Sequence, residues 1–138
     1  MEKRQPIFSQ RSLMSKKTGK FVLVLDVGTT GVKSFVFDET FNILAKSYKH
    51  IEEIKLHPGY VEQDPQAILE MAIDVMRSAV KESGVPIGSI LGMAITNQRE
   101  SIVAWDKKTS LPLCPIISWK DVRTKSIAQI FQMPIERW

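Results

Sequence analysis

The segment FVLVLDVGTTGVKSFVFD, residues 21–38, constrains the fold more than any other part of this sequence. It contains two runs of β-forming residues, 21–25 and 31–38, separated by a glycine-containing link at 26–30. The continuous apolar run at 21–25 is typical of a central, buried strand. Two strands joined by so short a link predict an antiparallel hairpin.

The next segments extend this hairpin. Residues 43–50 predict a third strand, which completes an antiparallel meander. Asp64 and Pro65 are a helix N-cap and a first helical residue, and Gly84 is a stop signal. Residues 90–96 predict a fourth strand, parallel to the first because it follows a helix. Apolar residues recur between the helix signals at helical spacing, namely Ile68, Met71, Ala72, Val75, Met76, Ala79 and Val80.

The last third of the chain is less regular. Residues 101–106 predict a strand, 107–110 a turn and 113–119 an extended segment. A final helix is expected from Asp121, with Ile127, Ile130 and Phe131 on one side. The whole pattern predicts an α/β domain with a mixed sheet: three antiparallel strands, a helix and a parallel strand.

Length and charge narrow the class of protein. The 138 residues suffice for one domain, expected at 21–138, after a disordered basic tail at 1–20. The net charge of +4 comes mostly from that tail, so the charge does not indicate a nucleic-acid binder. No apolar run approaches the ~20 residues of a transmembrane helix.

The single cysteine, Cys114, bears on the cellular compartment. One cysteine can form neither an internal disulfide nor a cysteine-based zinc site, which favours a reducing, cytoplasmic setting. Its apolar neighbours predict a buried, unreactive thiol. The basic, serine-containing tail leaves mitochondrial targeting as the alternative.

The link at 26–30 has the chemistry of a phosphate site. Asp26 follows a strand, where a carboxylate can hold Mg²⁺ through water. The glycines allow close approach of the backbone, and the backbone N–H groups and two hydroxyls can point at phosphate oxygens. An ordinary Asp-Gly hairpin turn would account for the same residues. The candidate phosphate-binding residues are Thr29, Thr30, Gly31 and Lys33.

A second polar group follows the fourth strand. Arg99 and Glu100 offer donors and acceptors side by side, which suits a polyhydroxyl substrate, although a surface ion pair would also explain them. Trp119 could provide an apolar wall for a carbon chain. Asp121 is interpreted as a helix cap and Arg123 as a surface residue.

Four motifs together resemble a known family. DVGTTGVK (26–33), HPGYVEQDP (57–65), TNQRE (96–100) and ISWKDVRT (117–124) occur in the order and spacing of the FGGY carbohydrate kinases, most closely the glycerol kinases among them. The resemblance covers 21–124 and implies the actin-like, ribonuclease-H-like ATPase fold. Any one of these motifs is a weak signal, whereas four in the same order and spacing are specific.

The resemblance also implies roles for individual residues. Asp26 is expected beside the metal, and Thr29, Thr30, Gly31 and Lys33 at the nucleotide phosphates. Arg99 and Glu100 are expected to bind glycerol hydroxyls, and Trp119 to line that pocket. The family often has serine at the position of Gly31 and arginine at that of Lys33, and Tyr60 replaces a usual tryptophan.

The implied reaction is transfer of the γ-phosphoryl group of ATP to a terminal hydroxyl of glycerol or a similar polyol, with Mg²⁺. The resemblance places the general-base aspartate and the second lobe beyond these 138 residues, so we expect this chain to be inactive alone. Another sugar or sugar acid as substrate, or a non-catalytic regulatory fragment, are the alternatives. The longer protein could be a homo-oligomer.

Overall fold

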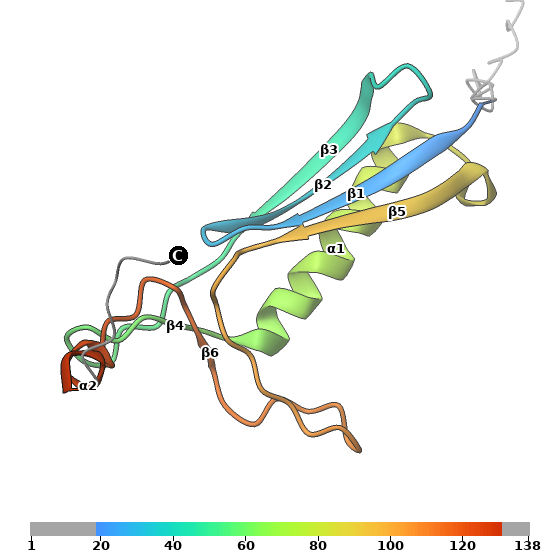
Figure 1. Cartoon of the computed structure of the whole chain (residues 1–138). Coiled ribbons are helices and arrows are strands. Elements are labelled where there is room, and N and C mark those ends of the chain that lie inside the picture. The colour runs from blue at the N-terminus through green and yellow to red at the C-terminus, as the bar shows by residue number, and fades with distance from the viewer. Residues whose placement is uncertain (1–18, 131–138) are drawn as a thin grey trace, which may run out of the picture.

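A computed structural model describes residues 19–130, which form a twisted four-stranded sheet with one long helix across a face (Figure 1). The strands are β1 (Phe21–Val27), β2 (Gly31–Phe37), β3 (Ile43–His50) and β5 (Ile90–Asn97), in the order β3-β2-β1-β5. β2 is antiparallel to β1 and β3, and β5 is parallel to β1. The predicted mixed sheet is therefore confirmed.

The hairpin β1–β2 is amphipathic, contrary to the prediction of a strand buried on both faces. Phe21, Leu23 and Leu25 are buried, while Val22, between Phe21 and Leu23, is 39% exposed and Val24, between the two leucines, is half-buried. On β2, Val32, Ser34 and Val36 are buried, as their alternation predicts. β1 also continues through Asp26 to Val27, two residues beyond the predicted apolar run. Within residues 19–130, α1 covers only one face of this sheet, so the side chains of β1 alternate between buried and exposed although the sequence is continuously apolar.

Helix α1 (Pro65–Ser83) begins and ends where the sequence predicts. The Asp64 side chain accepts hydrogen bonds from the backbone N–H groups of Gln66 and Ala67, and Gly84 ends the helix with a φ of 67°. The helix packs mainly on β2 and β3. Its buried residues are Ile68, Ala72, Val75, Ala79 and Ser83.

A smaller unit lies beyond the carboxyl ends of β1 and β5 (Figure 1). It contains the antiparallel pair β4 (Glu62–Gln63) and β6 (Ile116–Ile117) and the short helix α2 (Lys125–Ile130). The buried side chain of Ile116 joins it to the cluster formed by α1 and the sheet. The small unit therefore lies against the end of the sheet that carries the turn between β1 and β2.

Several predictions for the last third were wrong. Residues 101–106 form no strand and contribute only to two isolated β-bridges. Of the extended segment predicted at 113–119, only Ile116–Ile117 form a strand, β6. The turn at 107–110 is present and is held by the Asp106 carboxylate, which accepts from the backbone of Lys108 and Thr109. α2 begins at Lys125 rather than Asp121, and Cys114 is exposed rather than buried. Phe131, on the predicted final helix, lies outside the described residues, as does the predicted tail up to residue 18.

β5 forms an open edge of the four-stranded sheet. Because Met93 pairs with Leu23 and Ile95 with Leu25 in parallel register, these side chains lie on the face that α1 covers elsewhere. The helix does not reach them: Met93 is 51% and Ile95 59% exposed. Within residues 19–130, no helix has the length and apolar character needed to cross a membrane.

Candidate functional site

In the turn between β1 and β2, the backbone carbonyl groups accept hydrogen bonds from the rest of the chain. Gly28 donates its N–H to the carbonyl of Gly31 at 3.0 Å and so closes the turn. The Thr29 carbonyl accepts from Gln63 Nε2, and the Thr30 carbonyl accepts from the Ile51 N–H. The backbone N–H groups of Thr29 and Thr30 have no acceptor within residues 19–130. Two neighbouring free donors in a turn are what a phosphate group needs.

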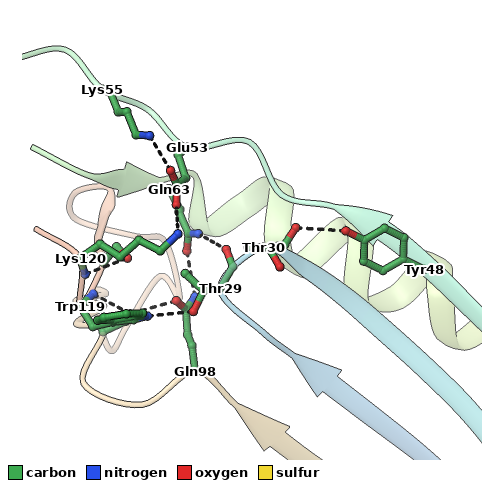
Figure 2. A network of polar contacts seen from close by, with 11 residues as sticks. Thr29, Thr30, Tyr48, Glu53, Lys55, Gln63, Gln98, Trp119 and Lys120 are labelled. Atoms are coloured by element: carbon green, nitrogen blue, oxygen red, sulfur yellow. Dashed lines mark hydrogen bonds and ion pairs between the residues drawn. The ribbon is translucent and has the colours of Figure 1, made fainter.

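Gly31 lies beneath the ring of Tyr48. A Cβ atom on Gly31 would lie 2.2 Å from Tyr48 Cε2, which no real contact tolerates. The Tyr48 hydroxyl donates to the Thr30 carbonyl at 3.3 Å (Figure 2). The glycine therefore allows an aromatic ring to cover the start of β2 and to hold the turn from behind.

Asp26 and Lys33 are opposite one another on β1 and β2. Lys33 Nζ lies 3.8 Å from Asp26 Oδ2, and both side chains are partly exposed. Within residues 19–130, no group of three histidine, cysteine, aspartate or glutamate side chains is placed to hold a metal ion. A single carboxylate fits Mg²⁺ that keeps most of its waters and is bound mainly by phosphates, because Mg²⁺ is commonly held in that way.

A cavity of about 430 Å³ lies between the turn and the loop after β5. It brings together four residues that the sequence singled out from three distant segments: Thr29, Arg99, Glu100 and Trp119. Gly28, Asn97 and Gln98 complete its lining. Asp26, Thr30, Gly31 and Lys33 lie in or next to the turn but outside this cavity.

The backbone at Glu100 is strained. Its φ is 62°, in the left-handed region that residues other than glycine, asparagine and aspartate rarely adopt. Such strain is concentrated at functional sites. Neither Arg99 nor Glu100 forms an ion pair with any residue from 19 to 130, so the surface ion pair that also explained them does not exist there.

Trp119 reaches the turn through its ring nitrogen. Trp119 Nε1 donates to Thr29 Oγ1 at 2.9 Å, across 90 residues of sequence. Since the hydroxyl oxygen of Thr29 accepts this bond, its hydrogen remains available for donation into the cavity. The Trp119 indole thus forms one wall of the cavity, and the Thr29 hydroxyl beside it is oriented by the hydrogen bond.

The loop that carries Trp119 is held by charged residues that the sequence analysis placed wrongly. Asp121 does not cap a helix: its carboxylate accepts from the Val61 N–H at 2.8 Å and from Arg123. Arg123 also binds Glu62 at 2.7 Å and stacks over the Tyr60 ring, 3.8 Å from its centroid. Hydrogen bonds from Arg123 hold the pKa of Asp121 well below its usual range.

A second ion-pair group lies on the other side of the turn. Glu53 binds Lys120 at 2.6 Å and Lys55 at 2.8 Å (Figure 2). Hydrogen bonds from Lys120 and then Lys55 lower the pKa of Glu53. The ion pair of Lys120 links the residue after Trp119 to the segment that follows β3. The loop that carries Trp119 is therefore held both by this ion pair and by the contacts of Asp121 and Arg123.

Sequence reasoning missed Gln63 and Gln98 as site residues. Gln63 has no exposed surface, and its amide joins the turn to Gln98. A glutamine just before a helix N-cap carries no pattern that marks it as buried. Gln98 belongs to the polar run after β5, which indicated a site without assigning it a role.

The chain is similar to known proteins both in sequence and in fold. The profile of the FGGY family of carbohydrate kinases, N-terminal domain, matches residues 21–137. Glycerol kinase 2 of Thermotoga maritima is 43% identical over 108 residues, which are 78% of this chain and 22% of that protein. The chain thus spans about a fifth of the length of such relatives.

Solved structures show the same fold. A crystal structure of Plasmodium falciparum glycerol kinase with ADP matches 85% of this chain and 24% of its own, with a TM-score of 0.72 and 31% identity. A gluconate kinase from Lactobacillus acidophilus matches 82% of this chain and 22% of its own, with a TM-score of 0.73 and 25% identity. The predicted kinase fold is confirmed, and the chain belongs to the FGGY family of carbohydrate kinases, to whose N-terminal domain it corresponds.

Proposed function

We propose that this chain supplies the alcohol-binding pocket and part of the phosphate site of an ATP-dependent glycerol kinase. The observation that carries the proposal is the cavity in which Thr29 of the turn lies beside Arg99, Glu100 and Trp119. The reaction is transfer of the γ-phosphoryl group of ATP to a terminal hydroxyl. The acceptor hydroxyl and the γ-phosphate must come into contact for this transfer, and the cavity lies directly beside the turn.

The pocket chemistry suits a short polyol. The Arg99 guanidinium provides several N–H donors, and the Glu100 carboxylate provides acceptors. Each hydroxyl of a polyol is both donor and acceptor, so neighbouring hydroxyls can use both side chains. The Trp119 ring offers an apolar surface to the carbon chain. Two of the matched proteins are glycerol kinases, which supports glycerol over longer substrates.

The turn suits the phosphate chain of ATP. Within residues 19–130, the N–H groups of Thr29 and Thr30 have no acceptor, and the Thr29 hydroxyl keeps its hydrogen for donation. Lys33 adds a positive charge nearby. Asp26 would contact the water shell of a nucleotide-bound Mg²⁺. The metal would supply charge neutralisation at the transferred phosphoryl group.

The chain alone is expected to be inactive. Among residues 19–130, the Glu100 carboxylate is the only one that lines the cavity, and in this proposal it binds hydroxyls. This part of the chain therefore leaves no further carboxylate in the cavity to accept the proton from the attacking hydroxyl. The loss of a general base commonly costs 10²–10⁴-fold in rate. A coupled assay that detected robust turnover by the 138-residue chain would contradict this part of the proposal.

A chimera tests the pocket itself. The aligned 108-residue segment of the Thermotoga maritima enzyme would be replaced by that of this chain. We expect glycerol phosphorylation, and we expect Arg99→Ala to raise KM for glycerol by about 10–100-fold, because a hydrogen bond to a charged group is worth ~1.5–3 kcal/mol. The matched control is Arg77→Ala, on α1. A KM unchanged by Arg99→Ala in a folded chimera would refute the pocket assignment.

The alternative substrate is a sugar acid. It is favoured by the similar TM-score of the gluconate kinase match. A six-carbon acid needs room for its carboxylate, and Arg99 could pair with it. The same chimera assayed with gluconate distinguishes the two acceptors.

A further inference from the structure

Five residues around the cavity form a closed ring of hydrogen bonds. Figure 2 labels Thr29, Gln63, Gln98 and Trp119 among them. Gln63 Nε2 donates to the Thr29 carbonyl at 2.7 Å, and Gln98 Nε2 donates to Gln63 Oε1 at 2.8 Å. Ser101 Oγ donates to Gln98 Oε1 at 3.0 Å and accepts from the Trp119 backbone N–H at 3.1 Å. Trp119 Nε1 closes the ring at Thr29 Oγ1.

The direction of every bond in this ring is fixed by its ends. The Thr29 carbonyl can only accept, so Gln63 must present its NH₂ group there and its oxygen to Gln98. The Trp119 N–H can only donate, so Ser101 must pass its own hydrogen to Gln98. All donors therefore run from Trp119 toward Thr29, an arrangement in which each bond polarises the next.

The ring connects the two halves of the proposed site. Trp119 is the wall of the alcohol pocket, while Thr29 and Gly28 belong to the turn between β1 and β2 and also line it. Gln63 is fully buried, and Gln98 is half-buried beside it. A movement of Trp119 or of the loop at Gln98 is therefore transmitted to the turn, because the buried Gln63 amide cannot exchange its partners for water without a cost.

We infer that Gln63 and Gln98 are positioning residues that couple occupancy of the alcohol pocket to the geometry of the phosphate turn. The inference rests on the proposed function, since it assumes that a polyol contacts Trp119. Neither glutamine lies among the residues that we expect to bind phosphate, and Gln63 does not line the cavity. Their effect is exerted through Thr29 and Trp119.

The test uses the full 138-residue chain, labelled with ¹⁵N, and glycerol as the probe. Two NMR signals are followed: the Trp119 indole N–H, assigned with Trp119→Phe, and the Thr29 backbone N–H, assigned by selective threonine labelling. In the unmodified chain, glycerol should shift both signals with the same titration midpoint. In Gln98→Met and Gln63→Met, the indole should still shift, while the shift at Thr29 is reduced by more than half.

Controls separate coupling from loss of structure. Gln66→Met places the same substitution on an exposed residue of α1 and should leave both shifts intact. The double variant Gln63→Met/Gln98→Met should lose no more than either single variant, because both interrupt one path. Should a methionine variant unfold, Gln98→Glu gives the same interruption, since a carboxylate cannot donate to Gln63 Oε1.

The outcomes distinguish this inference from the proposed function. A glycerol shift at the indole without one at Thr29 in the unmodified chain overturns the coupling and leaves the pocket intact. Equal shifts at Thr29 in the chain and in both folded methionine variants also overturn it. A chain in which glycerol shifts neither signal overturns the pocket assignment and the coupling together.

Discussion

The contact between Gly31 and Tyr48 allows a quantitative prediction. In Gly31→Ala, the new Cβ would lie 2.2 Å from Tyr48 Cε2, whereas a relaxed carbon–carbon contact is about 3.5–4.0 Å. Tyr48 is 53% exposed, so its ring can swing toward solvent. The strained rotamer costs about 0.5–1.5 kcal/mol, and the lost hydrogen bond to the Thr30 carbonyl about 0.5–1 kcal/mol.

Alanine also has an intrinsic advantage over glycine within a strand, of about 0.5–1 kcal/mol. In Tyr48→Ala, where no ring is present, Gly31→Ala should therefore stabilise the chain by that amount. In the unmodified chain it should destabilise by about 0.5–1.5 kcal/mol. The expected coupling free energy between the two positions is about 1–2.5 kcal/mol.

Urea unfolding at pH 7, followed by far-ultraviolet circular dichroism, measures this coupling in four proteins: the unmodified chain, both single variants and the double variant. If Gly31→Ala changed the free energy of unfolding equally with and without Tyr48, to within about 0.3 kcal/mol, the role of the ring over Gly31 would be refuted.

Three further predictions follow from the packing, the charges and the pocket. Val75→Ala removes two methyl groups from a fully buried site and should lower the free energy of unfolding by about 2–3 kcal/mol, whereas Leu69→Ala, at a site 54% exposed, should cost far less in the same urea titration. The pKa of Asp121 is lowered from 3.8, so its carboxylate stabilises the fold above that value and loses this effect as the pH falls toward the lower folded-state pKa. Thermal melts between about pH 5 and pH 2 should therefore show a shallower pH dependence of the melting temperature for Asp121→Asn. An unchanged pH dependence would contradict the contact with Arg123. Arg99→Lys keeps the charge but loses the fork of donors, so in the chimera its KM for glycerol should fall between those of Arg99 and Arg99→Ala.

The regular elements could be predicted because local signals and tertiary packing agree. Asp64, Pro65 and Gly84 mark α1 by capping geometry that works in any context. β2 alternates as its burial requires. The run at 21–25 misled because a continuous apolar sequence is compatible with burial on one face or both, and only the position of α1 decides between them.

The site could be predicted in its composition but not in its connections. The polar runs at the ends of β1 and β5 indicated a site at that edge, and Thr29, Arg99, Glu100 and Trp119 do share one cavity. By contrast, Asp121 contacts the backbone 60 residues away, and Gln63 contacts Thr29 across 34. Such long-range partners depend on the fold and leave no local pattern in the sequence.

The most direct test of the central claim is the substrate preference of the chimera. Its kcat/KM would be measured with glycerol, gluconate and xylulose at a saturating concentration of ATP and Mg²⁺. The proposal predicts that glycerol is preferred, and that Arg99→Ala reduces kcat/KM for glycerol by about 10-fold or more while Arg77→Ala does not. A folded chimera that preferred gluconate or xylulose, or that was indifferent to Arg99, would contradict the account.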